Sequence, residues 1–490
     1  MINGSWISAR MSKSSARSLW APLVSVVIIR LIGSHTLPVY DDAYITFRYA
    51  RNLAYAGSFV YNPGEWILGV TTPLFGIIST LFYLVHLPMP TTVLFLNIIV
   101  DGLISFLIYK ALCESVSQNS AIVFVLLFAF SPTIVRVSVG CMESNLFLLG
   151  SVCAILLSQK KKMLPAIGLA AILSFVRPEG AILIGLLLLK LIFARCWKKL
   201  LLSLSLVTII VVPPLIYLQS VYGSFVPHSI TAKSNDLYVS PLQVAQRLLV
   251  PEVFAIALLP LSIYGLALSL KGNSLLRMMS TWVGLYLASY LVMRPSVWSW
   301  YSLPVQFGLV LFAGIGLAHL IDNLKFFRGF AKKINLSYVG SFCAAITWVL
   351  LSAMQGESGV TRNIYEPLRA WGNGAGLESK MILATDIGAI GYYTNAYIYD
   401  GLGLVTPDAA RHNALISILR EHSFDYLFLN ATKETMQIFS DQQIGNRYSP
   451  IKRFSKAGFT AMDIDTKQYP NGWVQDYILF RLNLQTDPER

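Results

Sequence analysis

Long runs of apolar residues separated by short polar segments fill the first 354 residues of the chain. A helix needs about 20 mostly apolar residues to cross a lipid bilayer. We therefore predict an α-helical polytopic membrane protein with about eleven spans. The expected spans lie near 19–37, 91–112, 119–136, 143–158, 163–176, 179–195, 198–219, 251–270, 275–293, 298–320 and 337–354.

A further apolar run, at about 70–87, decides on which side of the membrane each loop lies. The short basic loops fall at 160–162, 195–199, 271–277 and 325–333. Lys and Arg accumulate in short cytoplasmic loops, and all four loops and the N-terminus share one side only if this run is not a full span. We therefore expect a re-entrant or interfacial segment there, a cytoplasmic N-terminus and a retained first span. The expected location is the inner (plasma) membrane.

The pattern of apolar and polar residues changes after residue 354. Short β-rich pieces separated by Gly, Pro and Asn turns replace the apolar runs. These pieces lie near 381–385, 397–399, 425–429 and 477–482, with a helix-like stretch near 410–422. We predict a membrane module at 1–354 with its first outer loop at 39–90, followed by a soluble extracytoplasmic α/β domain at 355–490.

Composition agrees with lipid as the main solvent. The chain is 55% hydrophobic and 13% charged, and its mean hydropathy is +0.59. The net charge of +13 reflects basic loops that alternate along the chain, which indicates membrane topology and not a nucleic-acid surface. The five cysteines lie in or beside apolar runs, so no disulfide framework is implied.

Polar clusters all face the outer side in this topology. They lie at 40–65, 141–144, 177–179, 222–236 and 294–300, and in the tail. Polar groups that converge at one face of an apolar bundle predict a site for a substrate that arrives at that face or in that leaflet.

Asp41 and Asp42 are the most reactive pair among these clusters. Two adjacent carboxylates raise each other's pKa, so one can act as a base that deprotonates an attacking hydroxyl. The alternative is structural: the pair caps the helix that follows, with Arg48 and Arg51 as surface partners. Spacing alone leaves both interpretations open. If a metal binds here, oxygen ligands favour magnesium or manganese; the sequence shows no zinc motif and no certain cofactor.

Several sequence blocks resemble a known family. The most specific are DDAYITFRYARN at 41–52, YNPGE at 61–65 and TTPL at 71–74. Weaker blocks follow in the family's order: GCMES at 140–144, RPEG at 177–180, YG at 222–223, PH at 227–228, AK at 232–233, WYSLP at 300–304, DIGAIGYY at 386–393 and DGLGL at 400–404. Together they resemble bacterial GT-C membrane glycosyltransferases, and among these the terminal β-(1→2)-arabinofuranosyltransferase type of the mycobacterial cell wall.

The resemblance implies a GT-C fold and an inverting transferase. Such an enzyme takes a sugar, a pentose such as arabinofuranose or a hexose, from a polyprenyl-phosphate carrier. It gives that sugar to a hydroxyl of a cell-envelope glycan, lipid or protein. An acidic residue of the first outer loop is then the base, a role that we carry to Asp41 or Asp42 without choosing between them.

A phosphate leaving group needs cations that take up its developing charge. The outer-face candidates for substrate contacts are Arg48, Arg177, His228, Lys233 and Arg294, with Glu143, Glu179 and Tyr44 beside them. Each has a structural alternative, such as an Arg177–Glu179 turn that pairs with itself, an ordinary loop histidine, or an Arg294 that anchors a span at the headgroup level. Outer-face aromatic residues fit an interfacial belt as well as sugar stacking.

Two other functional classes remain as alternatives. A transporter or a flippase of envelope precursors would also be polytopic, but such proteins often show duplicated halves with charges at mid-membrane. Here the polar clusters gather at one face and the halves do not match. An assembly protein whose tail binds a glycan without chemistry is the third class, and the carboxylate pair argues against it.

Overall fold

The computed structural model describes residues 13–234, 239–323, 358–374, 376–409, 414–458 and 475–483, without the side chains of 13–22, 233–234 and 358. The chain divides into two compact units, which we describe separately. Unit 1 comprises residues 1–35, 91–217 and 237–353. Unit 2 combines residues 36–90 and 218–236 with the tail 354–490, so the first loop and the tail belong to one compact body.

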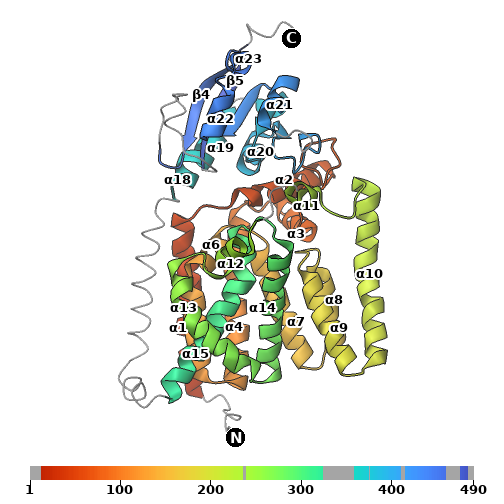
Figure 1. Cartoon of the computed structure of the whole chain (residues 1–490), viewed down its shortest axis with the longest axis vertical. Helices are drawn as coiled ribbons and strands as arrows, with labels where there is room; N and C mark the ends of the chain where they lie inside the picture. Colours follow the sequence, from red (N-terminus) through yellow and green to blue (C-terminus); the bar gives the residue numbers. More distant parts are fainter. Residues whose placement is uncertain are drawn as a thin grey trace. The chain divides into compact units, whose positions relative to one another are not determined.

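Unit 1 is a bundle of apolar helices (Figure 1). Its helices are α1 (Lys13–Thr36), α4 (Thr91–Ser115), α5 (Gln118–Phe130), α6 (Pro132–Val139), α7 (Ser144–Gln159), α8 (Met163–Leu173), α9 (Gly180–Phe193), α10 (Trp197–Tyr222), α12 (Pro241–Leu249), α13 (Val253–Leu270), α14 (Ser274–Met293) and α15 (Leu303–Asn323). A 3-10 turn, Ser299–Ser302, precedes α15.

The predicted multi-pass architecture is confirmed. By length and apolar composition, 5 helices among the described residues can each cross a bilayer, or up to 7 if each of two bent pairs is one span. Helices α7, α8 and α9 are apolar but shorter. Every predicted span from the first to 298–320 falls on one of these helices or on the bent pair of α5 and α6. The last predicted span, 337–354, lies outside the described residues.

The ambiguous run at 70–87 forms α3 (Pro73–Leu84) in unit 2. Its 12 residues extend about 18 Å at 1.5 Å per residue, well short of the roughly 30 Å hydrocarbon core. Pro73 at the first helical position accounts for its sharp start. This length agrees with the predicted re-entrant or interfacial segment.

A buried ion pair that we did not anticipate connects five helices of unit 1. The Arg30 Nε of α1 lies 2.8 Å from Asp101 Oδ2 of α4, and both side chains are 0% exposed. Arg30 also donates to the carbonyl oxygens of Phe128 and Ala129 at the end of α5. Pro132 has no N–H to serve the Phe128 carbonyl four residues earlier, so the guanidinium supplies the missing donor at the α5–α6 break. The carboxylate of Asp101 in turn accepts from Ser138 of α6 and Asn145 of α7.

The tail forms the predicted small α/β domain in unit 2. Its strands are β1 (Met381–Ala384), β2 (Tyr397–Asp400), β3 (Tyr426–Asn430), β4 (Tyr448–Ser455) and β5 (Asp476–Leu482). They form one sheet in the order β2-β1-β3-β5-β4. β1 runs parallel to both β2 and β3, whereas β5 pairs antiparallel with β3 and β4. The helices of this part are α18 (Ser358–Val360), α19 (Glu366–Gly374), α20 (Gly388–Thr394), α21 (Leu415–Glu421), α22 (Lys433–Ile438) and α23 (Gln442–Gly445).

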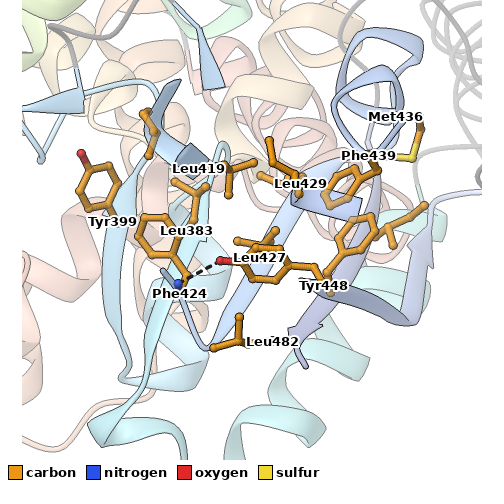
Figure 2. Packing of buried hydrophobic residues seen from close by; sticks show 14 of the residues in the cluster. Leu383, Tyr399, Leu419, Phe424, Leu427, Leu429, Met436, Phe439, Tyr448 and Leu482 are labelled. Atoms are coloured by element: carbon orange, nitrogen blue, oxygen red, sulfur yellow. Dashed lines mark hydrogen bonds between the residues drawn. The ribbon is translucent and has the colours of Figure 1, made fainter. Parts of the chain in front are cut away.

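Alternation along the central strand separates the two faces of this sheet. On one face, Leu427 and Leu429 join a buried cluster with residues of α21, α22 and α23 (Figure 2). On the other face, Phe428 stacks on Tyr477 of β5 with ring centroids 4.6 Å apart. Trp371 of α19 packs against the ring of Tyr426 on this second face. The sheet is therefore covered on both sides.

Candidate functional site

Asp41 and Asp42 form the first turn of α2 (Asp41–Ala56) in unit 2. The residue before them, Tyr40, is extended and makes no side-chain cap to the helix. The two Asp41 carboxylate oxygens accept main-chain N–H bonds from Gly388 at 2.7 Å and from Ala389 at 2.8 Å. The Asp41 carboxylate therefore caps α20 of the tail domain and not its own helix.

Two glycines allow α20 to approach α2 closely. A Cβ at Gly388 would lie 1.9 Å from the Asp41 carbonyl oxygen. A Cβ at Gly391 would lie 1.9 Å from the Tyr61 hydroxyl and 2.5 Å from an Arg48 nitrogen. Carbon atoms do not approach so closely in proteins, so the glycine spacing in DIGAIG is what lets this contact form.

A third carboxyl group in unit 2, that of Asp386, lies close enough to Asp41 for their charges to interact. It follows β1 by two residues, and Asn430 ends the neighbouring strand β3. The Tyr477 hydroxyl and the Asn430 amide, the latter at 3.3 Å, both donate to Asp386 Oδ2. We did not predict a role for Asp386 from its own chemistry, although it belongs to one of the family-like blocks.

Burial is the largest influence on the pKa values of the Asp41 and Asp386 carboxyl groups. Burial raises the pKa of Asp41 to about 6, and the charge of Asp42 adds to the increase, while the N–H bonds from Ala389 and Gly388 oppose it. Burial also raises the pKa of Asp386 well above its usual range, and the charge of Asp41 adds to this, while the bonds from Tyr477 and Asn430 oppose it. At neutral pH, Asp41 is therefore mostly ionised, whereas Asp386 keeps its proton to a higher pH than an ordinary aspartate does.

Arg48 lies inside unit 2, with 2% of its surface exposed. It donates to the carbonyl oxygens of Tyr61 at 2.8 Å, Gly391 at 2.9 Å and Ala396 at 2.7 Å. Its guanidinium also lies 4.2 Å from the centroid of the Tyr61 ring. The interpretation of Arg48 as a surface partner of the aspartates is thus wrong; Arg48 joins the first loop to the tail domain.

Replacing Arg48 by Lys is expected to lower the free energy of unfolding of unit 2 by at least about 3 kcal/mol. An ammonium group cannot reproduce the guanidinium fork, and each hydrogen bond to a charged group contributes about 1.5–3 kcal/mol. Thermal unfolding of the purified protein in detergent measures the change. The matched control is Arg420→Lys, because Arg420 is 56% exposed in its pair with Asp441 and should change stability by less than about 1 kcal/mol. Equal losses in both variants would contradict this assignment.

The other predicted residues of unit 2 have different surroundings. Tyr44 is buried among Tyr365, Tyr392 and Tyr393, and its hydroxyl lies 3.0 Å from that of Tyr393. His228 begins α11 (His228–Ser234), where its main-chain N–H bonds to the Leu68 carbonyl at 2.8 Å. Its half-buried ring places Nδ1 3.4 Å from the Leu404 carbonyl oxygen. Lys233 belongs to the same helix, but its side chain lies outside the described residues.

Three of the predicted residues of unit 1, Arg177, Glu143 and Glu179, form a cluster of their own. Arg177 lies 2.6 Å from Glu143 Oε1 and 2.8 Å from Glu179 Oε1, and its guanidinium lies 4.7 Å from the centroid of the Tyr301 ring. The second carboxylate oxygen of each glutamate finds no hydrogen-bond partner among the described residues. The predicted Arg177–Glu179 pairing is thus present, with Glu143 as an additional member.

Arg294 follows α14 as an exposed residue with a φ of 51°. Within the described ranges, no group of three or more His, Cys, Asp or Glu side chains is arranged to hold a metal ion.

Comparisons with known proteins identify the fold. ArnT from Cupriavidus metallidurans, solved bound to undecaprenyl phosphate, is similar with a TM-score of 0.64 at 10% sequence identity, over 96% of this chain and 98% of that one. The apo oligosaccharyltransferase of Archaeoglobus fulgidus is similar with a TM-score of 0.58 at 12% identity, over 95% of this chain and 76% of that one. A family model described as a domain of unknown function (DUF8728) matches residues 364–476. No curated protein sequence matches the chain. The chain therefore has the GT-C fold, with several membrane-spanning helices and a small C-terminal sheet domain.

Proposed function

We propose that this protein is a membrane glycosyltransferase that moves a sugar from a polyprenyl-phosphate carrier to a hydroxyl group of a cell-envelope acceptor. The observation that carries the proposal is the Asp41–Asp42 pair at the start of α2, held by α20, in a chain with the GT-C fold. The ArnT structure that shares this fold was solved bound to undecaprenyl phosphate, which supports a lipid-linked donor.

The Asp41–Asp42 pair has the chemistry that the reaction needs. A carboxylate of the pair takes the proton of the acceptor hydroxyl while its oxygen attacks the anomeric carbon of the donor sugar. The attack comes from the face opposite the carrier phosphate. The bond from that carbon to the phosphate breaks, the phosphate leaves with the electron pair, and the anomeric configuration therefore inverts. A pKa of about 6 leaves Asp41 ionised yet basic at neutral pH, which suits general-base catalysis.

The proposal also covers the donor sugar, the side of the membrane, the residues that contact the phosphate and a metal ion. The first-loop blocks favour an arabinofuranose-like pentose over a hexose, transferred at the outer face of the plasma membrane with the tail outside. His228, Lys233 and Arg294 are the candidates for the phosphate side. Arg177 is a weaker candidate, because two glutamates already neutralise its charge. A magnesium or manganese ion at the aspartates is a further expectation, and chelation of divalent cations during transfer tests it.

The test uses proteoliposomes that contain the purified protein and an acceptor glycan. Radiolabelled sugars are offered either as polyprenyl phosphates or as sugar nucleotides, and the Asp41→Asn/Asp42→Asn double variant serves as the control. We expect label in the glycan only from the polyprenyl donor and only with the wild type. Movement of labelled lipid across the bilayer without covalent transfer, equal in both proteins, would instead support the flippase alternative.

A further inference from the structure

The loop that follows β2 folds around one buried carboxylate. Asp400 ends β2 and is fully buried. Its carboxylate accepts main-chain N–H bonds from Leu402 at 2.9 Å and from Val405 at 3.0 Å. Its own main-chain N–H donates to the hydroxyl oxygen of Thr406 at 3.0 Å. Because hydrogen bonds to a charged acceptor are strong, this carboxylate fixes the path of the loop and the direction of its carbonyl groups.

The loop after β2 presents one main-chain carbonyl, that of Leu404, to the side chain of His228. The carbonyl oxygen lies 3.4 Å from Nδ1 of the His228 ring. The histidine backbone is held as well, because its N–H donates to the Leu68 carbonyl at 2.8 Å. The first loop also packs directly against the loop after β2: a Cβ at Gly69 would lie 2.4 Å from Val405 Cγ1 and 3.1 Å from the Leu404 carbonyl oxygen. Three segments of unit 2 therefore determine where this ring lies.

The contact with Leu404 also determines which nitrogen of the His228 ring carries a hydrogen. A carbonyl oxygen only accepts hydrogen bonds, so Nδ1 carries the hydrogen; an unprotonated Nδ1 would set two lone pairs against each other. In the neutral ring, Nε2 is then the unprotonated nitrogen. The ring is half-buried, and among the described residues it makes no hydrogen bond other than that of Nδ1. Nε2 therefore remains for a ligand.

We propose that Asp400 is a positioning residue of the transfer reaction, which presents the Leu404 carbonyl to His228 Nδ1 and so leaves Nε2 as the atom that meets the phosphate of the donor. The inference rests on the proposed function and extends it, because it names the ring atom that binds the phosphate and the tail residue that orients the ring.

The geometry suits a phosphate group at Nε2. A phosphate oxygen only accepts hydrogen bonds, and its negative charge favours the protonated ring, in which Nε2 donates to it. Both nitrogens of the protonated ring carry hydrogens, so the bond from His228 Nδ1 to the Leu404 carbonyl remains. As the bond between sugar and phosphate breaks, negative charge grows on the phosphate and the hydrogen bond from Nε2 strengthens. No proton needs to leave the ring in this step.

Two replacements of His228 distinguish its ring nitrogens. The Asn side chain places an amide nitrogen near the position of Nδ1 and nothing at Nε2, whereas the Gln side chain places its amide nitrogen near Nε2. His228→Asn should therefore lower kcat/KM for the polyprenyl-phosphate sugar by about 10²-fold, the usual effect of losing one donor to a developing charge. His228→Gln should lower it by about tenfold or less. A Gln variant that is no more active than the Asn variant overturns the role of Nε2.

Asp400→Asn tests the positioning role. Asn has the size of Asp, but its amide nitrogen cannot accept a main-chain N–H, so the loop loses one of the bonds from Leu402 and Val405. We expect kcat/KM for the donor to fall by about tenfold when His228 is present. When His228→Asn is already present, the further change should stay within about twofold, because Asp400 acts through that ring. An equal loss in both backgrounds indicates a merely structural role and overturns the proposal.

The tautomer of His228 gives a readout that needs no transfer. In proteoliposomes with ¹⁵N-labelled histidine, protonated and unprotonated ring nitrogens have separate resonances, and His228→Gln identifies this ring among the six histidines of the chain. At alkaline pH, where histidine is ordinarily neutral, the wild type should show a protonated Nδ1 and an unprotonated Nε2. Asp400→Asn should show a mixture of both tautomers.

A milder variant and a matched control accompany this measurement. Gly403→Ala strains the same loop, since Gly403 has a φ of 78°, and should shift the tautomer in the same direction as Asp400→Asn. The control is Asp425→Asn, because Asp425 is 15% exposed in the same domain and accepts the Met381 main-chain N–H at 2.9 Å. It should leave both the tautomer and the donor kinetics unchanged.

The outcomes separate this inference from the proposed function. An unprotonated Nδ1 in the wild type, or an unchanged tautomer in both loop variants, overturns the inference even if sugar transfer proceeds. If the wild type transfers no sugar while the resonances behave as expected, the proposed function fails and the orientation of His228 by Asp400 stands.

Discussion

Conversion of the catalytic member of the Asp41–Asp42 pair to Asn is expected to lower sugar transfer by about 10²- to 10⁴-fold, the usual contribution of a general base. Asn has the size of Asp but cannot take the proton of the acceptor hydroxyl. The single variants Asp41→Asn and Asp42→Asn, assayed with labelled polyprenyl-phosphate sugar, identify the member that acts. Asp41→Asn should also lose protection of the Gly388 and Ala389 amides, since one carboxylate oxygen that accepts an N–H becomes a donor.

The pH dependence of the wild type provides a check on the same assignment. A base must be ionised, and the pKa of Asp41 is raised by burial to about 6. If Asp41 is the base, transfer should fall as the pH decreases through about 6. Glu378→Gln, an exposed residue of the same unit, is the control and should transfer at the wild-type rate. Full activity in both aspartate variants would remove the catalytic assignment.

Arg30→Ala is expected to destabilise unit 1 by about 3–5 kcal/mol, the cost of leaving a buried charge without its partner. Asp101 would keep only its bonds from Ser138 and Asn145, and the carbonyl oxygens of Phe128 and Ala129 would lose their donor. Because native proteins are stable by only about 5–15 kcal/mol, we expect a large loss of folded protein in the membrane. Fluorescence-detected gel filtration after heating in detergent measures the shift.

A double variant separates charge from packing at this ion pair. Arg30→Met/Asp101→Asn removes both charges and retains most of the side-chain volume, so it should recover part of the stability lost in Arg30→Ala. The control is Arg277→Ala, in the first turn of α14 in the same unit. Arg277 is exposed, so it should change stability by less than about 0.5 kcal/mol. A melting temperature of Arg30→Ala equal to that of wild type would refute the role of this pair.

The spans were predictable from sequence because lipid tolerates few polar groups, and the length of each apolar run follows from bilayer thickness. The pairing of Arg30 with Asp101 was not predictable from the sequence. The two residues are 71 positions apart, and each interrupts an otherwise apolar run. The strand β4 was missed because Pro450 and Lys452 disturb its alternation. Both residue types are typical of an edge strand, which β4 is in this sheet.

The candidate site was predictable in part. The Asp41–Asp42 pair stands out in the sequence because adjacent carboxylates directly after an apolar run are costly. Its contact with α20 lies 347 residues away in the sequence, and no local pattern indicates that the acceptor of the Gly388 N–H is Asp41. The place of Asp386 beside Asn430 depends on the parallel pairing of β1 with β3, which short apolar strands do not specify on their own.

The manner in which α2 binds the tail domain affects how this protein can be engineered. Asp41, Arg48 and Arg51 reach the 388–396 segment through hydrogen bonds to its main-chain N–H and carbonyl groups. Recognition of this kind depends on few of the side chains that the segment carries: the absence of a Cβ at Gly388 and Gly391, and the rings of Tyr392 and Tyr393 that pack against Tyr44. A foreign tail that keeps these two glycines, the two tyrosines and the same backbone path is therefore compatible with the first loop, so chimaeras that exchange the rest of the tail are open to construction.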